Sequence, residues 1–186
     1  MCKALVTLAF SLALTALIPA PAANATIYTF TFESFDDTLS ATGDFTVDAS
    51  GEVDSIAGTI SGLVDQTISG IVANPSSPAA ALSPDGSFIY DNLFFADSSP
   101  NLNSNGLLFT TVQDTTGYWN LWGNSPLNYS LYESVGPGNY AIQQTGNLTV
   151  ARVPELSTWA MLGLGFAGLG LMARWRAPRQ ADMISA

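Results

Sequence analysis

Short runs of alternating apolar and polar residues recur between residues 26 and 152. In IYTFTFESF, residues 27–35, aromatic side chains alternate with threonine and glutamate, and a period of two is typical of a β-strand with two different faces. No segment here shows an apolar stripe with helical spacing, which a parallel sheet with crossover helices would need. We predict an all-β fold of eight or nine short strands, forming an antiparallel β-sandwich or barrel. Further strand-like stretches lie at 43–49, 58–72, 88–96, 106–113, 118–124, 128–134 and 146–152.

Turn-forming residues separate these stretches, at 49–51, 84–86, 105–106 and 136–139. The longest irregular stretch, ANPSSPAAALSP at 73–84, contains three prolines and several small residues, which predicts a surface loop. A domain boundary there would leave two halves too small for separate cores. We therefore predict a single domain at 26–152.

The first 25 residues have the order of a secretory signal peptide. Lys3 precedes an apolar run from Ala4 to Ile18, and small residues then lead to Ala23-Asn24-Ala25. The run is shorter than the roughly 20 residues that a bilayer span prefers. We expect the secretion machinery to export the chain and signal peptidase to cleave after Ala25.

The predicted domain is strongly acidic. From Thr26 to Ala151 it has thirteen acidic residues and no Lys or Arg, which gives a net charge of −13. Nucleic acids and anionic membrane surfaces are poor partners, because binding them needs basic residues. The chain has no His, and its one Cys, Cys2, lies in the predicted signal peptide. Histidine-dependent catalysis is thus excluded, and typical zinc or copper sites are disfavoured. We expect neither an enzyme nor a cofactor.

Carboxylates are the one remaining group with catalytic or metal-binding chemistry. Two carboxylates suffice for a glycosidase, and Glu33 and Glu133 are the glutamates on predicted strands with aromatic neighbours. We favour the alternative that both are ordinary solvent-facing acids. Asp48, Glu52 and Asp54, around the turn in DASGEVD, are weak candidates for a calcium site, and otherwise solvated turn residues.

Aromatic residues gather in GYWNLWGNSPLNYSLY at 117–132. On a strand, Trp119 and Leu121 would face one way and Tyr118 and Trp122 the other. The rings, which include Tyr129 and Tyr132, could stack on sugars between asparagine side chains. We favour the other interpretation, in which one face joins the core and the other packs beneath a loop.

A second apolar run covers about 156–173 and ends in Arg174, Arg176 and Arg179. Its length is just enough to span a thin bilayer. A positive cluster after an apolar run stays on the cytoplasmic side. We predict a transmembrane helix that follows an extracytoplasmic domain, with the arginines stopping transfer and a basic tail at 174–186.

Val153-Pro154-Glu155, together with STWAMLGLGFAGLGLMARWR at 157–176, resembles the PEP-CTERM sorting signal of exopolysaccharide-producing Gram-negative bacteria. That signal has a Val-Pro-Glu-Pro box, a glycine-rich helix and a basic cluster; here Leu156 replaces the second proline. The resemblance implies a substrate of exosortase, a membrane transpeptidase that would recognise Pro154 and Glu155 and cut at the box.

These features together predict a non-enzymatic, exported protein. We expect an intermediate anchored in the inner membrane, which exosortase then sorts to the cell surface or to an extracellular matrix of exopolysaccharide or biofilm. Two alternatives stay open: a carbohydrate- or calcium-binding β module held at the membrane, and a C-terminal helix that is a permanent anchor.

Overall fold

Ten β-strands make up the folded domain. The computed structural model describes residues 25–154 and 162–169, and confirms the all-β prediction. The strands are β1 (Thr26–Ser34), β2 (Leu39–Val47), β3 (Val53–Gly62), β4 (Gln66–Ile71), β5 (Ala81–Leu82), β6 (Ile89–Tyr90), β7 (Leu107–Thr111), β8 (Tyr118–Ser125), β9 (Asn128–Gly136) and β10 (Asn139–Arg152).

Eight of these strands close into an antiparallel barrel with the order β1-β10-β9-β8-β7-β4-β3-β2. Along the chain, each barrel strand lies beside the next, and β1 closes the circle by pairing with both β2 and β10. Of the two predicted architectures, the barrel is therefore the correct one. Closure leaves the barrel itself, as the described residues form it, without an edge strand open for pairing with another chain.

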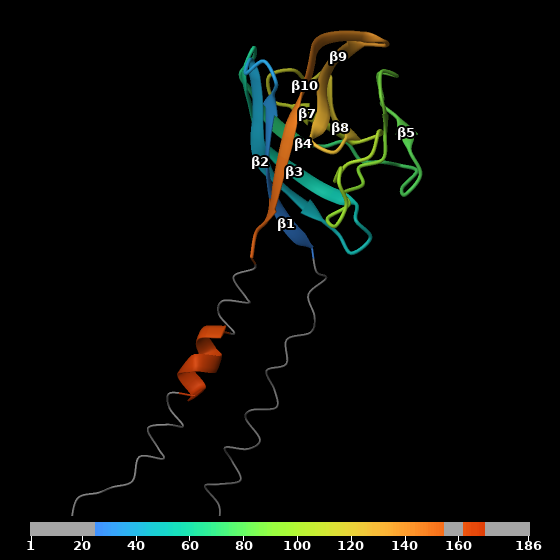
Figure 1. Cartoon of the computed structure of the whole chain (residues 1–186). Helices are drawn as coiled ribbons and strands as arrows, with labels where there is room; N and C mark the ends of the chain where they lie inside the picture. The colour runs from blue at the N-terminus through green and yellow to red at the C-terminus, as the bar shows by residue number, and fades with distance from the viewer. Residues whose placement is uncertain (1–24, 155–161, 170–186) are drawn as a thin grey trace, which may run out of the picture.

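The connection between β4 and β7, residues 72–106, is the one long excursion from this pattern. It carries β5 and β6, which form a separate two-stranded sheet, and it lies beside the barrel in Figure 1, where it is drawn in green and yellow-green. Most of the predicted loop at 73–84 is irregular, as expected. Asn92 fixes this connection to the barrel, because its amide donates to the carbonyl of Val72 (2.7 Å) and accepts from the N–H of Leu108 (3.0 Å).

The barrel interior is filled by side chains, as expected for eight strands. The inward-facing residues of all eight barrel strands form one buried apolar cluster, in which Phe32, Trp119 and Leu131 have no exposed surface. Phe94, from the connection, packs against Phe45 and Tyr28 with ring centroids 5.0 and 4.7 Å apart. Tyr28 pairs with Arg152 and with Phe45, so the two rings lie at the end of the barrel where the chain enters and leaves. Phe94 therefore covers that end of the core.

Several predicted strands differ in extent from those observed, and three differences are the largest. The stretch 58–72 is divided between β3 and β4, because Gly62 adopts a φ of 113° and begins a turn. The stretch 88–96 is mostly irregular, since Asn92 has a φ of 57° and its side chain replaces backbone pairing. The last strand begins at Asn139, earlier than predicted, and β10 pairs with β9 and β1 along its length.

The predicted membrane helix at about 156–173 is described only at 162–169, where the chain is helical and exposed. Within the described parts of the chain, no helix has the length and apolar character needed to cross a bilayer. The predicted signal peptide up to Asn24, including Ala23, lies outside the described residues, as do Glu155, Arg174, Arg176 and Arg179.

Candidate functional site

A hollow of about 380 Å³ with aromatic walls lies on the outer surface of the barrel. Strands β8, β9 and β10 supply one side, and the connection 72–106 supplies the other. Its volume falls in the lower part of the range for small-ligand pockets. The lining residues are Ser87, Phe88, Ile89, Ser104, Asn105, Asn120, Trp122, Tyr132 and Tyr140.

Four aromatic rings surround this hollow. Trp122 and Tyr132 meet edge to face at 4.7 Å between centroids, and Tyr132 meets Tyr140 at 5.7 Å. Phe88, from the connection, lies 5.4 Å from Tyr140 and 6.3 Å from Trp122. These contacts restrict the rotation of each ring, so the aromatic wall is formed before any ligand arrives.

Hydrogen bonds hold the connection against the barrel. Asp85 accepts from the hydroxyls of Ser134 on β9 (2.5 Å), Ser83 (2.6 Å) and Ser87 (2.8 Å). Burial alone would raise the pKa of Asp85, but these hydrogen bonds outweigh it and lower the pKa below the ordinary value. The hydroxyl of Tyr140 donates to the carbonyl of Ser87 (3.0 Å). The rim of the hollow is therefore fixed at several points.

Asn120 is the unusual polar residue of the site. Its side chain lines the hollow and is 2% exposed. The amide Nδ2 donates to the carbonyl of Asn105 (2.9 Å), which fixes the orientation of the amide because only the NH₂ end can face a carbonyl. Its Oδ1 has no hydrogen-bond partner among the described residues. A buried acceptor without a donor costs about 1–3 kcal/mol, so it calls for an explanation.

The structure confirms the predicted division of the aromatic segment. Trp119 and Leu121 belong to the barrel core, whereas Tyr118 and Trp122 lie on the outer face beneath the connection. Tyr129 faces the core and Tyr132 faces outward. Sequence reasoning did not single out Asn120, although the same period of two places it on the face of Trp122. It also missed Phe88 and Tyr140, which are distant in sequence.

The two glutamates considered for a glycosidase lie on opposite faces of the barrel wall. Glu33 is exposed on the outside of β1, as expected. Glu133 is 4% exposed and faces the interior from β9, so the expectation that it faces solvent is wrong. The Oε1 of Glu133 accepts a hydrogen bond from Nε2 of Gln66 (3.0 Å). Burial raises the pKa of Glu133. The hydrogen bond from Gln66 lowers this pKa by a smaller amount, and the negative charge of Asp114 raises it further. The geometry does not form a catalytic pair.

Glu133→Gln is expected to stabilise the barrel above pH 4.5 and to flatten the pH dependence of its stability. Because the pKa of Glu133 is raised above 4.5 by folding, the folded protein binds this proton more tightly than the unfolded chain. The resulting stabilisation is complete below pH 4.5 and is lost as the pH rises through the folded-state pKa. A glutamine stays neutral and can still accept from Gln66. Urea unfolding between pH 4.5 and about pH 8 measures the effect.

The matched control is Glu33→Gln, which removes an exposed carboxylate from the outer face. Its free energy of unfolding should stay within about 0.5 kcal/mol of the wild-type value, as for an ordinary surface substitution. Hydrogen bonds lower the pKa of Asp48 and Asp114, so their contributions are lost only below the ordinary value of 3.8, outside the measured range. Equal slopes for the wild type and E133Q would contradict the prediction.

The three weak calcium candidates do not converge. Hydrogen bonds from Ser50 and the backbone N–H of Glu52 lower the pKa of Asp48, whose carboxylate caps its own turn. Glu52 accepts from the hydroxyl of Ser77, and Asp54 is exposed on β3. Within the described ranges, no group of three or more acidic or Cys residues is placed to hold a metal ion. The geometry therefore gives the calcium alternative no support.

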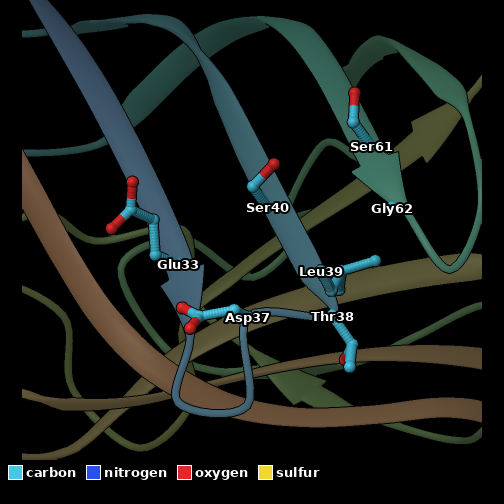
Figure 2. Close-up of a pocket in the computed structure, with 7 residues that line it drawn as sticks. All are labelled: Glu33, Asp37, Thr38, Leu39, Ser40, Ser61 and Gly62. Atoms are coloured by element: carbon cyan, nitrogen blue, oxygen red, sulfur yellow. The ribbon is translucent and has the colours of Figure 1, made fainter.

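A second hollow lies outside β1, β2 and β3, near the β1–β2 hairpin. Figure 2 shows Glu33 and Asp37 on one side of it, with Ser40 and Ser61 on the neighbouring strands. It has a similar volume, about 380 Å³. Its lining combines two carboxylates with small hydroxyl side chains, which is typical of a solvent-facing β-hairpin, and we assign it no function.

Comparison of the chain with known protein families, curated proteins and solved structures gives no significant match.

Proposed function

We propose that this chain is an exported, non-enzymatic protein of the cell surface or extracellular matrix, sorted by exosortase through residues 153–186. The observation that carries the proposal is the position of the barrel between the two predicted processing sites. Strand β1 begins at Thr26, directly after Ala25, and β10 ends at Arg152, directly before the Val153-Pro154-Glu155 box. Removal of the segments outside these sites would therefore leave every barrel strand intact.

The two ends of the barrel domain are also neighbours. Tyr28 pairs with Arg152 in the ladder between β1 and β10, and the N–H of Val153 donates to the carbonyl of Ile27 (2.9 Å). Figure 1 shows both strands leaving the barrel at the same end. Pro154 is exposed beyond this last contact. An exposed Pro154 at the end of a closed domain suits recognition by a processing enzyme.

The charge and the site chemistry support a role outside catalysis. The barrel carries a net charge of −13 over residues 26–151, which favours solubility and disfavours binding to anionic surfaces. The candidate glutamates Glu33 and Glu133 are separated by the barrel wall. We propose that the domain acts by display and binding, with a matrix of exopolysaccharide as its environment.

The double variant Pro154→Ala, Glu155→Ala is expected to accumulate as a membrane-bound precursor in a host that contains exosortase. The reason is that the changed residues are those that the enzyme would recognise, while the barrel before them is unaltered. Cell fractionation and the intact mass of the mature C-terminus measure the outcome.

The matched control is Asn147→Ala, Thr149→Ala, which changes two exposed residues of β10 close to the box. This control should be processed like the wild type. Sorting through the box is refuted if the Pro154/Glu155 variant yields a mature protein of unchanged mass and location.

A further inference from the structure

The aromatic hollow beside β8, β9 and β10 combines two features that call for one kind of ligand. The first is Asn120 Oδ1, a buried acceptor that has no donor among the described residues. Because the partner Nδ2 is held by Asn105, rotation of the amide cannot satisfy the oxygen. The oxygen has less than 1 Å² of accessible surface, so a ligand hydroxyl or N–H group must displace the lining side chains that cover it; once there, it would supply the missing hydrogen bond and recover its cost.

The second feature is the wall of aromatic rings. Trp122, Tyr132 and Tyr140 are half-buried and line the hollow, together with the buried ring of Phe88. Aromatic rings offer a large apolar contact area at a small cost in conformational entropy. The C–H groups on one face of a pyranose ring match such a surface, while the hydroxyls at the ring edge match amide and hydroxyl groups. Ser87, Ser104 and Asn105 provide such groups at the rim.

The charge of the site narrows the ligand class. None of the described residues that line the hollow is charged, so the site has no group to pair with a phosphate or a carboxylate. Residues 26–151 carry a net charge of −13, which repels polyanions. A purely apolar ligand would leave Asn120 Oδ1 without a donor.

We infer that this hollow binds a neutral saccharide unit of a polysaccharide chain, with a sugar ring against Trp122 and Tyr132 and a sugar hydroxyl donating to Asn120 Oδ1. The inference goes beyond the proposed export and sorting and depends on neither. It assigns the barrel a direct contact with polysaccharide, in which the connection 72–106 forms one wall of the site.

The test is affinity electrophoresis of the full chain, kept in a detergent without a sugar headgroup. Gels contain a neutral polysaccharide (dextran, laminarin or galactomannan), or alginate as the acidic one. We expect retardation by at least one neutral polysaccharide and none by alginate. Trp122→Ala and Asn120→Ala should each weaken binding about tenfold, the effect of losing one good contact.

Two further variants keep the result independent of folding defects. Ser104→Trp places a bulky ring at an exposed rim position and should abolish retardation without disturbing the core. Phe35→Ala removes an aromatic ring that is 57% exposed and lies outside the hollow, so it should bind like the wild type. Circular dichroism and the unfolding midpoint verify that each variant is folded.

The inference is overturned if no neutral polysaccharide in the panel retards the wild type, if alginate retards it as strongly, or if Ser104→Trp binds unchanged. The sorting variant Pro154→Ala, Glu155→Ala should bind normally in the same gels. A failure of saccharide binding can therefore be told apart from a failure of the sorting proposal.

Discussion

Trp119→Ala is expected to lower the free energy of unfolding by about 3–5 kcal/mol, the usual cost of truncating a fully buried large aromatic residue. Trp119 has no exposed surface and lies in the barrel core on β8. Its neighbours belong to strands paired around the barrel, so they cannot collapse into the space without bending the ladder. The cost therefore combines lost apolar burial with a cavity that persists.

The same substitution also breaks a partly buried hydrogen-bond network. The indole N–H of Trp119 donates to Oε1 of Gln66 (3.0 Å), which also accepts from the hydroxyl of Thr111 (2.6 Å). Gln66 in turn donates to Glu133 (3.0 Å). The network joins β4, β7, β8 and β9, four neighbours in the barrel order. Trp119→Phe keeps most of the apolar volume but loses the hydrogen-bond donor. We expect it to lower the free energy of unfolding by about 1–3 kcal/mol.

Urea unfolding followed by circular dichroism measures both variants. Trp122→Ala is the matched control, because it removes the same side chain three residues later on the same strand, from the half-buried outer face. We expect it to cost less than Trp119→Ala. A loss below about 1 kcal/mol for Trp119→Ala would contradict the position of Trp119 in the core.

Local pattern explains which features the sequence could predict. The inward and outward faces of β8 follow from alternation alone, so Trp119 and Trp122 were placed correctly. Turns with glycine and proline, such as the one at 136–139, were also correct, because their chemistry is local. The choice between a sandwich and a barrel could not be made, since closure depends on β1 pairing with β10 from the far end of the domain.

The binding hollow depends on contacts of the same long-range kind. Phe88 and Asn105 come from the connection 72–106, and Tyr140 comes from β10, which lies far from that connection in the sequence. Nothing in the sequence places these residues beside Asn120. The stretch 88–96 has the sequence pattern of a strand, but it is mostly irregular because the side chain of Asn92 hydrogen-bonds to the backbone of Val72 and Leu108. Such bonds are part of the tertiary structure and leave no periodic signal.

Gly58→Ala is expected to destabilise the barrel by about 3 kcal/mol, at the upper end of the cost of overpacking. Gly58 on β3 pairs directly with Gly43 on β2. A Cβ added at Gly58 would lie 2.1 Å from the carbonyl oxygen of Thr42 and 2.8 Å from Cα of Gly43. Both are backbone atoms in a paired strand, so they cannot move aside as the end of a flexible side chain would.

The paired glycines indicate how the barrel closes. An eight-stranded sheet must bend sharply to meet its own edge, and glycines allow strands to kink and approach closely. Gly43 and Gly58 place this approach between β2 and β3, and Gly146 provides another where its added Cβ would lie 2.0 Å from the carbonyl of Glu33. Thr59→Ala, at the next, outward-facing position of β3, is the control and should change stability by no more than about 0.5 kcal/mol. If Gly58→Ala destabilised the barrel as little as Thr59→Ala in urea unfolding, closure would not need the close approach of β2 and β3. The curvature would then have to arise from β-bulges, such as the one at Thr46/Val47.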